Sequence, residues 1–274
     1  MLVRQLASAT GVRLALNGTC PGGQVGAAYV RWPDGHRSVM SCLPAGNADA
    51  VRRTESLLAA GRARGVPAPR YELVAELPSA VAIVQELLPG SPPAVIGRPT
   101  VESMIEMNRR CRGILADHED LPDPSLYLRA DGPGYCLHRP LARYDRRTAR
   151  LLAEVEEIGA AVPEQLAGDD LVHFDFHPEN VLVDAAGAVT GVVDWDGAGR
   201  SNGYLDLFTL RFDLARRAPE LGRWLGELLH DAAADEVILA CWAHMSLRLV
   251  DWSIRHHTAA HVTTWLEVAE VVRP

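Results

Sequence analysis

The stretch LVHFDFHPENVLVD places four polar side chains, His173, Asp175, His177 and Asn180, between runs of apolar residues. Unpaired polar groups beside a buried strand cost free energy, so these groups either satisfy one another or carry out chemistry. A second carboxylate, Asp194, ends the apolar run of GVVDWDG further along the chain. The set therefore combines carboxylate, amide and imidazole groups at the ends of two expected core strands.

The order and spacing of Asp175, Asn180 and Asp194 match the template for phosphoryl transfer. In that template a loop carboxylate orients the acceptor hydroxyl and receives its proton, which is the role expected of Asp175. A loop amide and a later carboxylate hold Mg²⁺ on the nucleotide phosphates, which is the role expected of Asn180 and Asp194. Mg²⁺ prefers hard oxygen ligands and completes its octahedron with water and phosphate oxygens, so two protein ligands are enough.

Two simpler interpretations of this stretch stay open. Asp and Asn favour turns, so the three residues could be turn formers without chemistry. The alternation of His173, Asp175 and His177 would place all three on one face of a strand, as in a transition-metal site. That site would leave Asn180 without a role, and the run His-Pro-Glu-Asn turns the chain away at once. We expect His177 to support the loop by hydrogen bonding rather than to bind a metal.

Further candidate binding residues lie outside these positions. The Gly-rich run GTCPGGQVG contains Gly22 and Gly23, whose backbone amides could cradle phosphates, although an ordinary turn between strands explains the run equally well. Three acidic residues, Glu179, Asp196 and Asp213, could line a cleft that binds a cation. Each of them taken alone is more typical of a solvated surface.

Composition narrows the range of partners. The chain has 274 residues, of which 48% are hydrophobic, and this is enough for one large domain or two lobes. The formal net charge of -8 argues against a nucleic-acid partner and fits a cationic or metal-complexed ligand. The five cysteines lack paired metal spacing and predict reduced thiols. With neither a signal-peptide pattern nor an apolar run of membrane length, we expect a cytoplasmic protein without a membrane partner, as a monomer or a dimer.

The hydrophobic pattern predicts an α+β architecture with a β-rich front part and a helical back part. In the front part we expect strands at 12–16, 26–32, 37–43 and 80–88 and a helix at 48–65, with the stretch 66–77 between that helix and the last strand. The break PGSPP at 89–93 is the expected link, which divides the chain into lobes 1–89 and 90–274. From about residue 100 helical patterns dominate, interrupted by the two motif strands. The Pro- and Gly-rich stretch 120–140 is expected to form a surface loop.

HFDFHPENVLVD followed by GVVDWDGAGRSNGYLDL resembles the aminoglycoside phosphotransferase and choline kinase-like family, whose hallmark is His-x-Asp-x-x-x-x-Asn and then an Asp-Trp or Asp-Phe pair. The front part is similar as well, in PDGHRSVM, ESLLAAGRARGVPAPR and AIVQELLPG. The resemblance implies a bilobal protein-kinase-like fold, with a small β-rich nucleotide-binding lobe (1–89) and a larger, mainly helical catalytic and acceptor-binding lobe (90–274).

The resemblance also implies roles for individual residues. His173 would support the catalytic loop, and Asp206 in YLDL would brace it from a buried position. Backbone groups near Glu86 and Leu88 would meet the adenine of the nucleotide. These roles come in addition to the proton-accepting and metal-binding roles described above.

One departure from the family pattern concerns the third strand, where the family carries a Lys that contacts the phosphates and pairs with a helix Glu. This chain has no Lys, and the position falls at Ser41, whereas the expected partner Glu55 is present. An Arg such as Arg37, the Gly-rich loop or Mg²⁺ must then neutralise the phosphates. Arg is no simple substitute for Lys, because its planar fork needs a different approach geometry.

From this resemblance we expect an ATP- or GTP-dependent, Mg²⁺-dependent kinase that phosphorylates a hydroxyl of a cationic small-molecule antibiotic and so confers resistance. The acceptor would be an aminoglycoside or a basic cyclic peptide of the viomycin or capreomycin type. Two alternatives stay open: a kinase of a primary metabolite such as choline, homoserine or a sugar, and a nucleotide-binding pseudokinase, which the missing Lys would favour.

Overall fold

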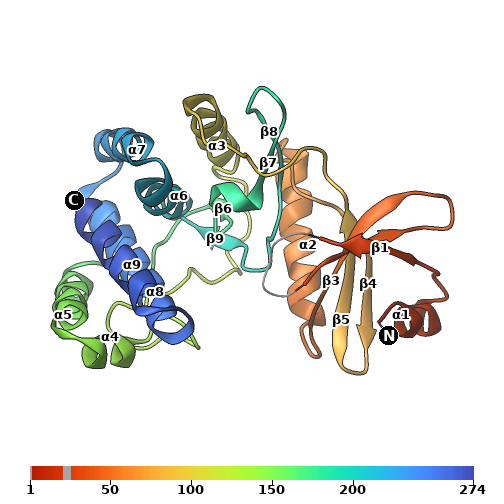
Figure 1. The fold of residues 1–274 in the computed structure, drawn as a ribbon, viewed down its shortest axis with the longest axis horizontal. Coiled ribbons are helices and arrows are strands. Elements are labelled where there is room, and N and C mark those ends of the chain that lie inside the picture. The colour runs from red at the N-terminus through yellow and green to blue at the C-terminus, as the bar shows by residue number, and fades with distance from the viewer. Residues whose placement is uncertain (1, 21–25) are drawn as a thin grey trace. The chain divides into compact units, whose positions relative to one another are not determined.

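The computed structural model describes residues 2–20 and 26–274, and the chain divides into two compact units. Unit 1 comprises Met1–Pro93 and Asn180–Ala198, and unit 2 comprises Ala94–Glu179 and Gly199–Pro274. This division differs from the predicted cut after residue 89 in two respects, because the first unit runs to Pro93 and residues 180–198 return to it. Figure 1 shows the α+β character expected from the sequence, with a β-sheet in unit 1 and mostly helices in unit 2.

Unit 1 contains a five-stranded antiparallel sheet in the order β1-β2-β3-β5-β4. Its elements are α1 (Leu2–Thr10), β1 (Ala15–Thr19), β2 (Ala28–Arg31), β3 (Arg37–Pro44), α2 (Ala48–Ala63), β4 (Tyr71–Leu77) and β5 (Ala80–Glu86). The four expected strands and the expected helix are present, although β1 begins three residues later than expected. The strand β4, within the stretch 66–77, was not predicted. The helix α1 was not predicted.

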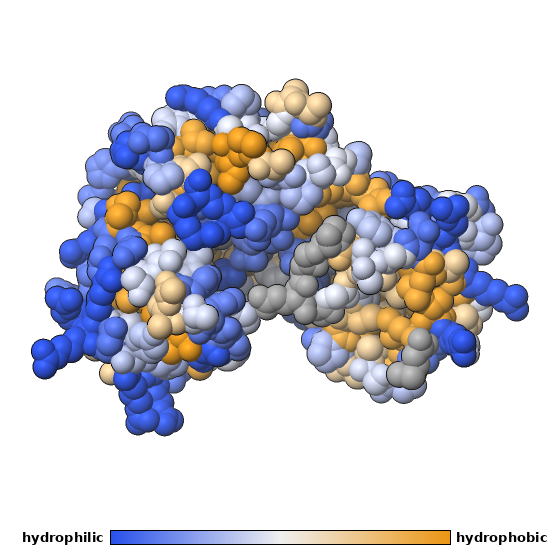
Figure 2. Space-filling view, in the orientation of Figure 1, coloured by the Kyte–Doolittle hydropathy of each residue, from blue (hydrophilic) through white to orange (hydrophobic). Residues whose placement is uncertain are grey.

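The apolar run of β5 has a direct physical reason, because both faces of this strand are covered. Val81 and Ile83 pack with Val51 of α2 on one face, and Ala82 and Val84 belong to the cluster on the other face, which also contains Leu6 of α1. A strand buried on both faces reads as a continuous apolar run rather than an alternating one. Figure 2 shows that hydrophobic surface gathers over the part of unit 1 around α1 and β4.

The hairpin of β7 (Val181–Val183) and β8 (Val189–Val192) joins unit 1 through backbone contacts. Val183 bridges to Ser91, and the amide of Val192 donates to the carbonyl of Pro67 at 2.9 Å. Thr190 Oγ1 also donates to the carbonyl of Pro89 at 2.7 Å. These hydrogen bonds explain why the hairpin of β7 and β8 belongs to unit 1 although it is distant in sequence from the five-stranded sheet.

Unit 2 is mainly helical and holds the other motif strand. Its elements are α3 (Arg98–Arg110), α4 (His138–Tyr144), α5 (Arg146–Ala161), β6 (Asp170–Val172), β9 (Gly199–Ser201), α6 (Tyr204–Arg217), α7 (Pro219–Ala232), α8 (Asp235–His256) and α9 (Ala259–Val271). A 3₁₀ turn (Pro178–Asn180) forms the last part of the loop that follows β6. The strand β6 pairs with β9, which places the start of the motif beside the segment that leads into α6.

The helix α8 packs against α4, α5, α6 and α9. By length and composition α8 is apolar enough to cross a membrane, whereas no apolar run of membrane length was expected. However, 67% of its apolar window is buried inside the protein, as is typical of a core helix. This helix is therefore weak support for a membrane span.

The stretch 120–140 is irregular, as expected, but it is not simply a surface loop. Leu126, Leu128 and Cys136 are each at most 1% exposed. A Cβ at Gly159 of α5 would lie 2.7 Å from Leu128 Cβ, so this glycine makes room for the loop. The carbonyl of Leu126 is hydrogen-bonded to His244 Nδ1 of α8 at 2.9 Å. The loop thus contributes to the core, because its apolar residues anchor it between α5 and α8.

Candidate active site

The loop that follows β6 is held by a buried carboxylate from α6. Asp206 Oδ2 accepts from the amide of His173 and Asp206 Oδ1 from the amide of Phe174, each at 2.8 Å. Burial raises the pKa of the Asp206 carboxyl to about 7, against the lowering effect of these two amides. Phe174 has a positive φ of 66°, which is uncommon for a residue other than glycine and marks a strained backbone. The Asp206 contacts hold the chain in this conformation immediately before Asp175.

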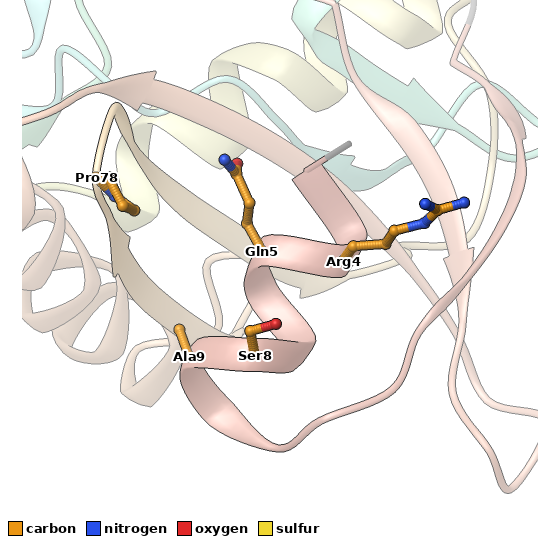
Figure 3. Close-up of a pocket in the computed structure, with 5 residues that line it drawn as sticks. All are labelled: Arg4, Gln5, Ser8, Ala9 and Pro78. Carbon is orange, nitrogen blue, oxygen red and sulfur yellow. The ribbon is translucent and has the colours of Figure 1, made fainter.

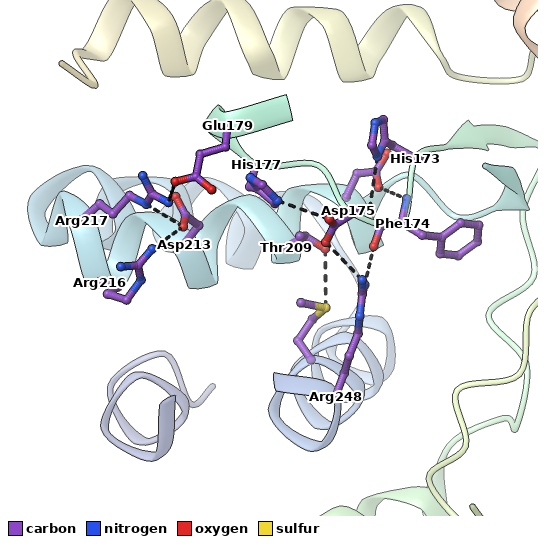
Figure 4. A network of polar contacts seen from close by, with 12 residues as sticks. His173, Phe174, Asp175, His177, Glu179, Thr209, Asp213, Arg216, Arg217 and Arg248 are labelled. Atoms are coloured by element: carbon purple, nitrogen blue, oxygen red, sulfur yellow. Dashed lines mark hydrogen bonds and ion pairs between the residues drawn. The ribbon is translucent and has the colours of Figure 1, made fainter. Parts of the chain in front are cut away.

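Asp175 lies at the centre of a polar network in unit 2 (Figure 4). Arg248 Nη2 of α8 donates to Asp175 Oδ1 at 3.1 Å, and His177 Nε2 contacts Asp175 Oδ2 at 3.3 Å. The amide of Asp175 donates to His173 Nδ1 at 3.3 Å. The Asp175 side chain is still 47% exposed, so solvent and solutes reach it.

The charges around Asp175 keep it ionised. Burial, the largest single influence, acts to raise the pKa of its carboxyl, but the His177 hydrogen bond and the Arg248 charge together lower that pKa to about 2. The same contact acts in reverse on His177, whose pKa is raised by Asp175 although burial opposes this. Asp175 is therefore a carboxylate at neutral pH, ready to accept a hydrogen bond from a hydroxyl.

The two acidic residues predicted to bind a cationic substrate in this unit are already paired with arginines. Arg217 Nη2 donates to Glu179 Oε1, and Arg217 Nε donates to Asp213 Oδ1 at 2.9 Å. Arg216 Nη2 donates to the same Asp213 oxygen at 3.1 Å. The hydrogen bond from Arg217 lowers the pKa of Glu179. Glu179 and Asp213 thus belong to a charge-balanced network rather than to an open acidic surface.

In unit 1 the hairpin brings the two predicted metal ligands to the same end. Asn180 directly precedes β7 and Asp194 follows β8 by two residues, and the amide of Val193 donates to the carbonyl of Asn180 at 2.9 Å. Asp194 has a positive φ of 66°. Trp195, only 2% exposed, donates through Nε1 to the carbonyl of Val192 at 2.8 Å and so anchors this strained position. Burial, followed by the charge of Asp194, raises the pKa of Asp196.

An amide oxygen and a carboxylate at one hairpin end are the hard donors that Mg²⁺ prefers, so these residues fit this ion. Transition-metal ligation finds less support. Within residues 2–20 and 26–274, no group of three or more His, Cys, Asp or Glu side chains is arranged to hold a metal ion. The alternation of His173, Asp175 and His177 therefore does not produce such a site among the described residues.

The position expected to carry a Lys lies in the middle of the sheet. Ser41 of β3 pairs with Ile83 of β5. Glu55, the expected partner of the missing Lys, instead accepts from Arg62 Nη2 at 2.6 Å and from the amide of Tyr71 at 3.2 Å. Glu55 is thus bound to an arginine of its own helix and to the start of β4.

The other predicted nucleotide contacts are placed as follows. The amide of Glu86 donates to the carbonyl of Arg70 at 2.9 Å, so this N–H is not available to an adenine. Leu88 packs against Gly191, where a Cβ would lie 3.0 Å from Leu88 Cδ1. Gly22 and Gly23 lie outside the described residues.

A cavity of about 740 Å³ in unit 1 does not involve any predicted site residue. It is lined by residues of α1 and of the turn between β4 and β5 (Figure 3): Arg4, Gln5, Ser8, Ala9 and Pro78. These side chains include neither a carboxylate nor an imidazole, so we assign no chemistry to this cavity.

The arginines that contact the site were not predicted from the sequence. Arg216 and Arg217 end α6, where basic residues are common because they favour the helix C-terminus. Arg248 offered a clearer signal, because it stands alone in the apolar run MSLRLV of a core helix. A charge in such a run requires a partner. The sequence alone does not say that this partner is Asp175.

Comparisons with known proteins agree with this fold. The model of the phosphotransferase enzyme family (APH) matches residues 20–248. A thermostable mutant of the aminoglycoside phosphotransferase APH(4)-Ia, in its apo form, is 15% identical with a TM-score of 0.74, covering 99% of this chain and 98% of that one. Another structure of a thermostable mutant of that protein, also carrying D198A, is a ternary complex with ADP and hygromycin B.

Two further structures share the fold. The aminoglycoside-3'-phosphotransferase of type VIII is 20% identical with a TM-score of 0.61, over 89% of this chain and 97% of that one. The macrolide 2'-phosphotransferase MphH from Brachybacterium faecium is 17% identical with a TM-score of 0.54, over 100% and 98%. No curated protein matches the sequence. The family match covers most of the chain, and the chain therefore belongs to the phosphotransferase enzyme family, as a small-molecule kinase that acts on hydroxyl groups.

Proposed function

We propose that this enzyme transfers the γ-phosphoryl group of ATP or GTP to a hydroxyl of a small molecule, with Asp175 as the group that orients the hydroxyl and receives its proton. The observation that carries this proposal is the ionised, half-exposed Asp175 carboxylate, held by Arg248 and His177. The ADP in the complex of APH(4)-Ia supports a nucleotide donor.

Asn180 and Asp194 would hold Mg²⁺, which neutralises charge on the nucleotide phosphates when it is bound. The chain's own part in the reaction is mainly positioning. Asp206 fixes the loop backbone before Asp175, and the low pKa of Asp175 keeps its carboxylate ready to accept the hydroxyl hydrogen bond at neutral pH. A carboxylate of such low basicity contributes chiefly by orienting the nucleophile in line with the phosphoryl group.

For the acceptor we propose a hydroxyl-bearing antibiotic, which would make this a cytoplasmic resistance enzyme. A cationic acceptor, either an aminoglycoside or a basic cyclic peptide, is supported by the net charge of -8 and by the hygromycin B complex of APH(4)-Ia. A second candidate is an acceptor of low charge such as a macrolide. The pairing of Glu179 and Asp213 with Arg217 favours this candidate, because these acids are already neutralised.

The experiment is phosphate transfer from ATP and from GTP to a panel of acceptors, with and without Mg²⁺, read by mass spectrometry of the acceptor. The panel holds aminoglycosides, capreomycin, macrolides, choline and homoserine. Asp175→Asn is the test variant. Asp184→Asn is the matched control, because this exposed acid of the same stretch accepts the turn amides of Ala186 and Ala188 at 2.9 Å each.

An acceptor that gains one phosphate with the wild type and with Asp184→Asn, but at least about 1,000-fold more slowly with Asp175→Asn, supports the mechanism. Equal rates for the wild type and Asp175→Asn would refute the role of Asp175. Modification of choline or homoserine alone would replace the antibiotic proposal by a metabolite kinase. Nucleotide-dependent thermal stabilisation without transfer to any acceptor would favour the pseudokinase.

A further inference from the structure

The peptide groups around Phe174 are held from two helices at once. On the amino side, the Phe174 N–H donates to Asp206 of α6 at 2.8 Å. On the carboxyl side, the Phe174 carbonyl accepts from Arg248 Nη1 of α8. The second terminal nitrogen of the same guanidinium donates to Asp175 Oδ1 at 3.1 Å. One arginine therefore holds both the strained backbone and the carboxylate that follows it, as Figure 4 shows.

We propose that Arg248 is the positioning residue of the catalytic loop, which fixes the Asp175 carboxylate relative to its own backbone. The inference rests on the proposed role of Asp175 in phosphoryl transfer. Nothing in the family comparison assigns a role to α8, and the residue acts through Asp175 rather than on the acceptor itself.

The need for such a clamp follows from the backbone. A non-glycine residue at positive φ costs about 1–3 kcal/mol and persists only where the surroundings over-determine it. Phe174 has φ of 66°, and any relaxation toward negative φ would turn the Asp175 side chain. Asp206 alone fixes the N–H of Phe174 and leaves its carbonyl and the Asp175 carboxylate to be held by another group. Arg248 contacts both of these groups.

The chemistry of the guanidinium suits this task better than an ammonium. Its planar fork presents several N–H donors in fixed directions, so two terminal nitrogens can bind two different acceptors at once. Arg248 is 26% exposed on its side chain, so the contacts are partly shielded from water. A lysine carries the same charge and could bind one of the two acceptors. It would not hold the Phe174 carbonyl and the Asp175 carboxylate in a fixed orientation relative to each other.

Several charged and titratable groups lie around this clamp. Asp175 also contacts His177, while His173 and Asp206 hold the loop from the side of β6 and α6. On the other side, burial lowers the pKa of His244 on α8 to about 4, and the charge of Arg248 lowers it further. Burial raises the pKa of Tyr135, on the loop before α4, to about 12, and the charge of Arg248 opposes this. Since these groups also respond to pH, the test relies on a substitution series at fixed pH rather than on a pH profile.

The test compares Arg248→Ala and Arg248→Lys with Arg255→Ala. Arg255 lies two turns further along α8, has a similar side-chain exposure of 23%, and forms a two-point ion pair with the fully buried Asp251 at 2.7 and 2.8 Å. It does not contact the catalytic loop in the described structure. Its removal therefore reproduces the loss of stability from a broken α8 ion pair without touching Asp175.

Two readouts are combined. The first is hydrogen–deuterium exchange of the full-length protein without ligand, over peptides that cover residues 173–177. We expect about tenfold faster exchange of these amides in Arg248→Ala than in Arg255→Ala, because the loop opens locally when its clamp is lost. The second is steady-state kinetics with the acceptor found above. There we expect kcat to fall about 100-fold in Arg248→Ala and about tenfold in Arg248→Lys, with the KM for nucleotide changed less than about threefold.

Added methylguanidine should restore part of the kcat of Arg248→Ala, because it replaces the missing guanidinium. It should not restore activity that is lost because the variant is less stable. The inference is overturned if exchange over 173–177 is the same in Arg248→Ala and Arg255→Ala, or if both variants have the same kcat. If exchange responds as expected while the wild type transfers no phosphate to any acceptor, the clamp stands and the proposed function fails. The two failures are therefore distinguishable.

Discussion

Replacing Asp206 by Asn tests whether the buried brace of the catalytic loop titrates near neutral pH. The carboxyl is fully buried and accepts the amides of His173 and Phe174, and burial raises its pKa to about 7. Asn keeps the volume and one carbonyl acceptor but has no charge. The substitution therefore removes the titration while it preserves most of the packing.

The sign and size of the effect follow from proton linkage. The unfolded chain loses the Asp206 proton near pH 4, whereas the folded protein keeps it until about pH 7. The folded state thus binds an extra proton between these values, and this contribution to stability is full below pH 4 and is lost as the pH rises to 7. From pH 5 to pH 7 the wild type should lose about 2 kcal/mol of unfolding free energy relative to Asp206→Asn.

The assay is urea unfolding of both proteins at pH 5, 6, 7 and 8. Asp145→Asn serves as the control. Asp145 caps α5, and the hydrogen bond from the Thr148 amide lowers its pKa, so it is ionised in both states over this range. The control substitution should change the unfolding free energy by the same amount at every pH, so its dependence on pH should run parallel to that of the wild type. Parallel curves for the wild type and Asp206→Asn would refute the reasoning and would mean that the folded protein keeps Asp206 ionised throughout.

Three further outcomes are expected. Arg217→Ala should free Glu179 and lower the KM for cationic acceptors severalfold in steady-state assays, and an unchanged KM would exclude Glu179 from acceptor binding. Gly159→Ala should lower the unfolding free energy by about 1–3 kcal/mol in urea titrations, because its Cβ would lie 2.7 Å from Leu128 Cβ, and an unchanged midpoint would contradict that clash. Asp194→Asn should remove the Mg²⁺-dependent part of the thermal shift produced by ATP, and a shift that persists in full would argue against metal binding there.

The sheet of unit 1 was largely predictable, because its strands carry clear hydrophobic runs separated by turn residues. The run AVAIV predicted an apolar strand, and the structure shows that both of its faces are covered. The helix α1, which covers one of these faces, escaped prediction because residues 2–10 contain no capping signal and only Leu6 is buried. The loop 120–140 was read as surface because Pro and Gly dominate its composition, whereas three of its apolar side chains belong to the core.

The predicted substrate acids show the limit of sequence reasoning most clearly. Glu179 and Asp213 both carry negatively charged side chains, which is all that the sequence shows. Their negative charges support a cationic partner only if no arginine neutralises them. Arg217 lies 38 residues from Glu179, and this contact exists only because α6 passes beside the motif loop. Pairing between distant residues depends on packing, so local pattern cannot reveal it.

The sequence by itself determined the chemical types at the site and their order, Asp175, then Asn180, then Asp194, because motif spacing along one chain is a local property. It also determined the α+β class, since hydrophobic periodicity records which faces are buried. Only the tertiary structure decided how Asp175 is held and charged, because its partner Arg248 comes from a helix 73 residues away. A pKa and a side-chain orientation depend on the groups that surround a residue in space, and these groups meet only when the helices have packed.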